Sequence, residues 1–308
     1  MKDLLSIYAL TPSTIEEMIG RAKLLKQLSQ SSKMCLSLQG KTLGMIFEKS
    51  STRTRLSFEV GMTQLGGTAI FISSRDTQIA RGESLQDTAK IFSRYLDAVV
   101  IRTFAQQYVD DFANYAEIPV INGLTDLLHP CQILSDIFTL SEIFCDYSRC
   151  KVAYIGDGNN IANSWINLAA KMPINLSLAC PKGYEPNVEI LARCCNEAPG
   201  SVLLTQDPFE AAKDADVLYT DVWASMGQEE EQEKRIRDFM GYRVDARLLQ
   251  VAKKSAVVMH CLPAHRGEEI SADVIDGKQS IVFQQAENRL HLQKAILEML
   301  MIGGKKGE

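Results

Sequence analysis

LGMIFEKSSTRTR, residues 43–55, is the stretch that decides the fold. Residues 43–47 are an apolar run typical of a buried strand, and residues 48–51 form the turn before a helix that opens with TRTR at 52–55. Hydroxyl groups, unpaired backbone N–H groups and two guanidinium groups therefore meet at a helix N-terminus, where the helix dipole favours an anion. Arginine binds phosphate oxygens through two parallel hydrogen bonds, so we expect a phosphate-bearing ligand there. The alternative is a capped helix whose charges are only solvated.

Length and composition are those of a globular protein with two domains. The 308 residues exceed the usual size of one domain, and 46% hydrophobic and 23% charged residues suffice to bury a sizeable core. The net charge of −5, without a basic block, argues against nucleic acid as a partner. The sequence has neither the apolar leader of a signal peptide nor a run of about 18 apolar residues. We therefore expect a soluble, cytoplasmic protein that does not bind membranes.

The eight cysteines show no regular spacing and are expected to be reduced, most of them as core side chains. A zinc site drawn from His129, Cys131, His260 and Cys261 is conceivable. However, the CxxC or HExxH spacing that would support such a site is missing. We expect no metal.

Short apolar runs alternate with segments of helical periodicity along the whole chain. The runs are continuous, as AVVI at 98–101 shows, and strands buried on both faces of a parallel sheet have this pattern. The expected strands are residues 43–47, 68–73, 98–103, 119–122, 151–155, 176–180, 202–205, 217–220, 256–260 and 280–283. The expected helices include residues 84–96, 129–144, 161–172 and 287–301. Ser84 and Asp87 form a plausible capping pair, and Pro130 suits a first helical turn. The predicted fold class is α/β, with two doubly wound parallel-sheet domains joined by the bridging helix 129–144.

Polar clusters follow the ends of these strands, where open α/β sheets bind their ligands. The clusters are residues 51–55, Arg102, His129 with Gln132, residues 156–160, Asp221, residues 260–263 and residues 285–289. Gly156 and Gly158 match a dinucleotide-binding loop only in part, because Ile161 stands at the third glycine position.

Six of these segments, in this order, resemble the motifs of the aspartate/ornithine carbamoyltransferase family. They are FEKSSTRTR at 47–55, HPCQ at 129–132, GDGNN at 156–160, DVWASMG at 221–227, HCLP at 260–263 and AENR at 286–289. The resemblance covers nearly the whole chain. It implies that residues 1–133 bind carbamoyl phosphate, that helix 290–308 packs back on them, and that residues 134–289 bind ornithine.

The resemblance further implies transfer of the carbamoyl group of carbamoyl phosphate to the δ-amine of L-ornithine, as part of arginine metabolism. The products are L-citrulline and phosphate, and no cofactor is required. Gln78 would reach carbamoyl phosphate in a neighbouring subunit, which implies a homotrimer. The implied carbamoyl phosphate ligands are Ser51, Thr52, Arg53, Thr54, Gln78, Arg102, His129, Gln132, Cys261, Leu262 and Arg289. The implied ornithine ligands are Asn160, Asp221, Ser225 and Met226.

The implied catalytic residues are Arg102, His129, Asp221 and Cys261. Arg102 and His129 would stabilise negative charge on the carbonyl oxygen, whereas Asp221 and Cys261 would orient the attacking amine and help its proton to leave. Taken without the resemblance, His129 could be a helix-start residue and Cys261 a buried small side chain. Two other functions stay open: a carbamoyltransferase for another amine such as putrescine, and a non-catalytic sensor of carbamoyl phosphate or an amino acid.

Overall fold

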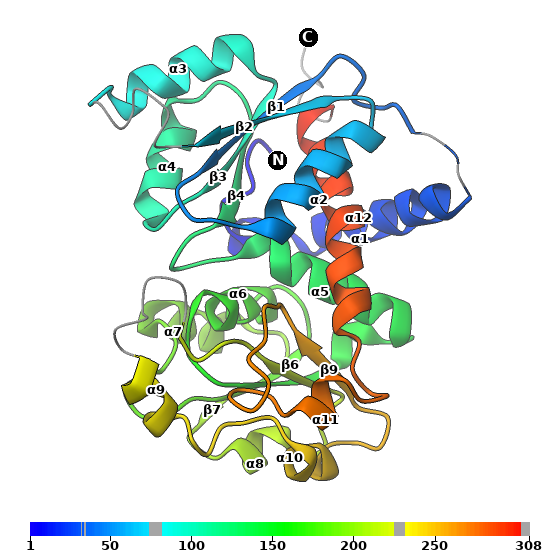
Figure 1. The fold of residues 1–308 in the computed structure, drawn as a ribbon, viewed down its shortest axis with the longest axis vertical. Coiled ribbons are helices and arrows are strands. Elements are labelled where there is room, and N and C mark those ends of the chain that lie inside the picture. Colours follow the sequence, from blue (N-terminus) through cyan, green and yellow to red (C-terminus); the bar gives the residue numbers. More distant parts are fainter. Residues whose placement is uncertain (32, 34, 74–81, 225–231, 303–308) are drawn as a thin grey trace. The chain divides into compact units, whose positions relative to one another are not determined.

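The computed structural model describes residues 1–31, 33, 35–73, 82–224 and 232–302 (Figure 1). The chain divides into two compact units, one formed by Met1–Phe138 with Glu287–Glu308 and the other by Thr139–Ala286. The boundary between Phe138 and Thr139 falls within helix α5 (Pro130–Ile143), so this helix contributes residues to both units.

The first unit contains a four-stranded parallel sheet in the order β2-β1-β3-β4. Its strands are β1 (Thr42–Phe47), β2 (Thr68–Ser73), β3 (Ala98–Arg102) and β4 (Val120–Leu124). Its helices are α1 (Pro12–Gln30), α2 (Thr52–Gln64), α3 (Leu85–Tyr95), α4 (Gln106–Tyr115) and the first part of α5. Every residue of β3 is buried, as the continuous apolar run predicts for a strand covered on both faces. The predicted cap of α3 is confirmed, since Asp87 N donates to Ser84 Oγ at 3.1 Å.

The second unit contains a five-stranded parallel sheet in the order β7-β6-β5-β8-β9. Its strands are β5 (Lys151–Ile155), β6 (Asn175–Ala179), β7 (Val202–Thr205), β8 (Val217–Thr220) and β9 (Val257–His260). Its helices are α6 (Asn160–Ala169), α7 (Val188–Glu197), α8 (Pro208–Ala212), α9 (Gln232–Asp238), α10 (Ala246–Val251) and α11 (Ala272–Ile275). Ile155, Leu218 and Val258 from three neighbouring strands are fully buried in one core. The predicted α/β class with two parallel sheets is confirmed.

The strand predicted at residues 280–283 is wrong. Ser280 makes only an isolated bridge to Val258, and helix α12 (Val282–Met301) begins two residues later. Val282 is buried in the core of the second unit, but Phe283 is 73% exposed. Residues 280–283 therefore lead into a helix that buries one face. Four residues are too few to show whether an apolar segment belongs to a helix or to a strand.

Helix α12 continues into the first unit, where polar contacts to α1 hold it. Lys26 Nζ on α1 donates to Asn288 Oδ1 at 2.7 Å, and Lys294 Nζ donates to Ser29 Oγ at 2.7 Å. A Cβ atom on Gly61 of α2 would lie 3.3 Å from the Lys294 side chain, so α2 and α12 approach closely (Figure 1). Among the described residues, no helix combines the length and apolar character needed to cross a bilayer.

Candidate active site

The start of α2 carries the first group of candidate residues. Ser51 precedes the helix in an extended conformation, and its Oγ accepts a hydrogen bond from Thr54 N at 3.1 Å. Ser51 is thus the N-cap, and the predicted helix start at Thr52 is confirmed. Arg289 Nη2 on α12 donates to the buried Thr54 Oγ1 at 2.8 Å. Residues far apart in the sequence therefore meet at this helix terminus.

The two arginines of the TRTR segment have different surroundings. Arg55 Nε donates to Glu59 Oε1 at 2.9 Å, and the Arg55 guanidinium lies 3.9 Å from the centroid of the Phe71 ring. Arg55 is also exposed. The expectation that both guanidinium groups face an anion is therefore corrected for Arg55. Arg53, in contrast, lies close enough to His129 for its charge to lower the pKa of that histidine.

The turn between β1 and α2 is tied to the neighbouring strands of the sheet. Arg102, the last residue of β3, pairs with Phe47, the last residue of β1, and its carbonyl accepts from Glu48 N at 2.9 Å. The Glu48 carboxylate accepts a hydrogen bond from the Thr103 hydroxyl. The register of parallel strands therefore places Arg102 beside the turn that leads into α2.

His129 lies at the centre of a cluster of positive charge. Its side chain is buried, and burial together with the charges of Arg289, Arg102 and Arg53 holds its pKa well below the ordinary value. His129 is therefore neutral and offers a ring N–H without adding charge. The three guanidinium groups around it form a site suited to a phosphate dianion.

Gln132, in the first turn of α5, has an amide whose orientation is fixed. Its Nε2 donates to Asp136 Oδ1 at 2.9 Å, and the residue is 1% exposed. Its Oε1 is buried and accepts no hydrogen bond from the described residues. Such an acceptor suits a ligand N–H group. The neighbouring Cys131 is a core thiol, since burial raises its pKa to about 12.

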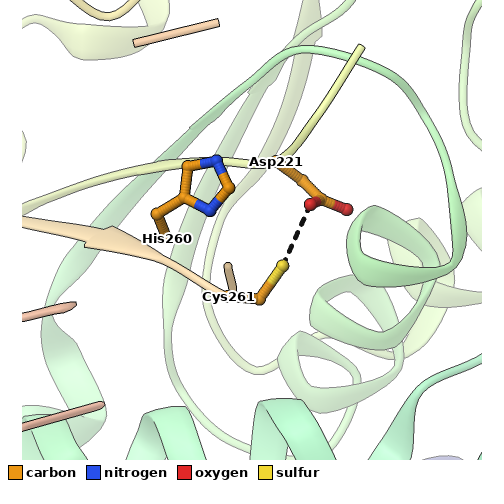
Figure 2. Close-up of side chains that lie close together, drawn as sticks. All are labelled: Asp221, His260 and Cys261. Carbon is orange, nitrogen blue, oxygen red and sulfur yellow. Dashed lines mark hydrogen bonds between the residues drawn. The ribbon is translucent and has the colours of Figure 1, made fainter. Parts of the chain in front are cut away.

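A second group of candidate residues lies at the strand ends of the other unit. Ile155 pairs with Thr220, which pairs with His260, so the segments that follow β5, β8 and β9 leave the same edge of the sheet. Asp221 and Cys261 are therefore neighbours, and Cys261 Sγ donates to Asp221 Oδ1 at 3.0 Å (Figure 2). The Asp221 side chain is buried, and Val222 N donates to the same oxygen at 2.8 Å.

His260 shapes the turn that carries Cys261 and Leu262. Its Nδ1 accepts from Leu262 N at 2.8 Å, so the proton resides on Nε2, which lies 3.0 Å from Glu269 Oε1. Possible metal-ligand atoms of Asp221, His260 and Cys261 lie within 4.8 Å of one another (Figure 2). Because both ring nitrogens of His260 are engaged, a metal would have to displace one of these hydrogen bonds.

The glycines after β5 serve packing within the unit. A Cβ atom on Gly158 would lie 2.2 Å from Pro186 N, and Gly158 N donates to Tyr184 O at 2.8 Å. The chain itself thus fills the space that the pyrophosphate of a dinucleotide would need. This contact argues against the partial match to a dinucleotide-binding loop.

Of the remaining expected site residues, three have no described position and two have one. Gln78, Ser225 and Met226 lie outside the described residues. Asn160 is the half-buried first residue of α6. Leu262 follows Cys261 with a φ of 59°.

Two residues near Asp221 were missed by the sequence reasoning. Asn159 Nδ2 donates to Asp221 Oδ2 at 2.9 Å. An asparagine two residues before the predicted helix 161–172 is the N-cap signal that could have identified it. Arg235 is buried and donates through Nη1 to Asp157 Oδ2 and to Trp223 O, each at 2.8 Å. Arg235 lies in a run of charged residues that reads as a solvated surface, so the sequence offers no signal for it.

Comparisons with known proteins agree with this arrangement. Residues 2–142 match the carbamoyl-P binding domain of aspartate/ornithine carbamoyltransferase, and residues 148–300 match its Asp/Orn binding domain. The chain is 60% identical to an ornithine carbamoyltransferase of Syntrophus aciditrophicus over 97% of this chain and 99% of the relative, and 51% identical to one of Methanoculleus marisnigri over 98% of each.

Solved structures give the same result. The structure of ornithine carbamoyltransferase from Pyrococcus furiosus has a TM-score of 0.95 at 47% identity, covering 99% of this chain and 98% of that one. The corresponding structure from Thermus thermophilus has a TM-score of 0.88 at 39% identity, covering 98% and 99%. The chain belongs to the aspartate/ornithine carbamoyltransferase family.

Proposed function

We propose that the chain transfers the carbamoyl group of carbamoyl phosphate to the δ-amine of L-ornithine, releasing L-citrulline and phosphate. Full-length relatives at 50–60% identity are named ornithine carbamoyltransferases. The observation that carries the choice of co-substrate is the buried Asp221 carboxylate beside the Cys261 thiol. An acidic group of this kind suits a cationic amine and disfavours a dicarboxylate such as aspartate. The cytoplasmic location expected from the sequence stays a prediction.

The first unit, in this proposal, binds carbamoyl phosphate. The phosphate is held by the start of α2 at Ser51, Thr52, Arg53 and Thr54, with Arg102 and Arg289. The buried Gln132 Oε1 accepts from the carbamoyl NH2 group, and the neutral His129 with Arg102 donates to the carbonyl oxygen. One such donor typically lowers the barrier by about 2.7–4 kcal/mol. The family resemblance implies that Cys261 and Leu262 are further ligands of carbamoyl phosphate.

The second unit binds ornithine through Asp221 and, by the family resemblance, through Asn160, Ser225 and Met226. The attacking δ-amine must be neutral, although a free alkylammonium has a pKa of about 10.4. Asp221 attracts and orients the ammonium, and its proton leaves by way of the Asp221–Cys261 pair or solvent. The neutral amine nitrogen then bonds to the carbamoyl carbon, and the bond from that carbon to the phosphate oxygen breaks. Phosphate leaves with the electron pair and takes up the second proton of the amine.

A homotrimer is also part of the proposal. Helix α2 exposes Leu56 and Val60, which lie on one helix face, and the edge strand β2 exposes Ile70. Exposed apolar side chains of this kind suit coverage by a neighbouring subunit. The family resemblance further implies that Gln78 of each subunit completes a neighbour's site.

A panel of amines tests the choice of co-substrate. Steady-state formation of ureido products is measured with ornithine, putrescine and aspartate at saturating carbamoyl phosphate. We expect kcat/KM for ornithine to exceed the other two values by about 100-fold or more. Putrescine leaves the polar contacts to the α-amino acid group unmade, and the second carboxylate of aspartate is repelled by Asp221. Comparable values for putrescine would assign a different substrate, and binding of both ligands without citrulline would identify a sensor.

A further inference from the structure

Asn159 contacts the Asp221 carboxylate through the oxygen that Cys261 does not use. Asn159 Nδ2 donates to Asp221 Oδ2 at 2.9 Å, whereas Cys261 Sγ and Val222 N donate to Oδ1 at 3.0 Å and 2.8 Å. The buried carboxylate is therefore held at both oxygens, and its plane is fixed. Asn159 is not among the ligand residues that the family resemblance implies.

The orientation of the Asn159 amide is determined by its own environment. Its Oδ1 caps helix α6, accepting from Ile161 N at 2.9 Å and from Ala162 N at 3.4 Å. The hydroxyl of the fully buried Tyr154 lies 3.2 Å from the same oxygen. A flipped amide would turn its NH2 group towards these N–H donors and its oxygen towards the Asp221 carboxylate. The NH2 group must therefore point at Asp221.

We infer that Asn159 is a positioning residue for the amine substrate, because it uses a helix cap to aim the Asp221 carboxylate. This inference rests on the proposed function. Asn159 itself contacts no reacting atom in this account. It acts through Asp221, which attracts the ammonium form of the δ-amine and fixes its position before the proton leaves.

The variant Asn159→Asp separates this role from helix capping. Aspartate caps a helix as well as asparagine does, so the contacts to Ile161 N and Ala162 N are retained. The donor that faces Asp221 becomes a carboxylate oxygen, and two carboxylates at this distance cannot both stay ionised. We expect the acidic limb of the pH profile of kcat/KM for ornithine to move to higher pH by about one unit or more. At pH 7 we expect kcat/KM to fall about tenfold or more, with an unchanged Kd for carbamoyl phosphate alone.

Two further variants make the test specific. Asn159→Ser retains a cap and removes the donor without adding charge, so kcat/KM for ornithine should fall while the pH profile keeps its position. Asn187→Asp is the matched control, because Asn187 caps α7 in the same unit by accepting from Glu189 N and Ile190 N. This control should leave both kcat/KM and the pH profile unchanged.

The inference is overturned if Asn159→Asp and Asn159→Ser keep the wild-type kcat/KM and pH profile, or if Asn187→Asp shifts the profile equally. Activity of the wild type in the same assay reports on the proposed function separately. A wild type that forms citrulline with unaffected Asn159 variants would refute only the positioning role.

Discussion

His129 illustrates how much of this site is decided by the environment of single residues. The sequence places a histidine before Pro130, which by itself suits a helix start. Burial of the ring, together with the charges of Arg289, Arg102 and Arg53, lowers its pKa and keeps the ring neutral. A neutral imidazole can donate to a developing oxyanion without repelling the three guanidinium groups that we propose to hold the phosphate. The residue type was predictable, but its charge state depends on three segments that are distant in sequence.

The lowered pKa of His129 predicts a pH-dependent stability. The unfolded histidine titrates near pH 6.5, and the folded one titrates lower, so the folded state binds fewer protons in this window. The stabilisation is present above about pH 6.5 and is lost as the pH falls through the folded pKa, with a slope of at most about 1.4 kcal/mol per pH unit. In urea unfolding between pH 7.5 and 5.5, His129→Gln should lose less stability than the wild type.

The wild-type protein, measured over the same pH range, supplies the reference for that measurement. Parallel curves for the wild type and His129→Gln would contradict the account of His129 as a buried neutral ring.

Elements were predictable from the sequence where the apolar runs are long or are bounded by clear turn residues. The start of α2 at Thr52 and the cap of α3 at Ser84 follow from local chemistry, and both are confirmed. The prediction for residues 280–283 was wrong because three consecutive apolar residues, Ile281, Val282 and Phe283, show no period, and the exposure of Phe283 appears only in three dimensions. Arg55 could not be separated from Arg53, since its partners Glu59 and Phe71 are set by helix geometry and by a neighbouring strand.

Strand register accounts for the part of the site that sequence reasoning located well. Asp221 and Cys261 each follow the last residue of a strand, and Thr220 pairs with His260 in the sheet. The two side chains must therefore lie side by side at one edge. Arg235 follows no such rule, because its contacts to Asp157 and Trp223 arise from the packing of α9 against loops. Sequence patterns thus predict residues placed by a sheet better than those placed by loops.

The whole molecule is expected to be a trimer with sites completed by neighbouring subunits. Light scattering should give a mass of about three chains. Gln78→Ala and Cys261→Ala should each be nearly inactive as homogeneous proteins. After unfolding and joint refolding in equal amounts, about a quarter of the sites should combine both native residues, because subunits assort at random. Activity should return to a corresponding fraction of the wild-type value.

Separate refolding of each variant is the control for that experiment. Mixed oligomers with no more activity than the separate variants would place Gln78 in its own subunit's site or outside any site. A monomeric mass would remove the shared site from the account.

The most direct test of the central claim compares carbamoyl phosphate binding and citrulline formation in Arg53→Ala and Arg55→Ala. Arg53 belongs to the guanidinium cluster around His129, whereas Arg55 pairs with Glu59 on the same helix. We expect Arg53→Ala to weaken carbamoyl phosphate binding by about 100-fold or more and to abolish nearly all citrulline formation. Arg55→Ala should stay within about threefold of the wild type, as expected for an exposed ion pair. Equal losses in both variants, or full activity of Arg53→Ala, would contradict the account.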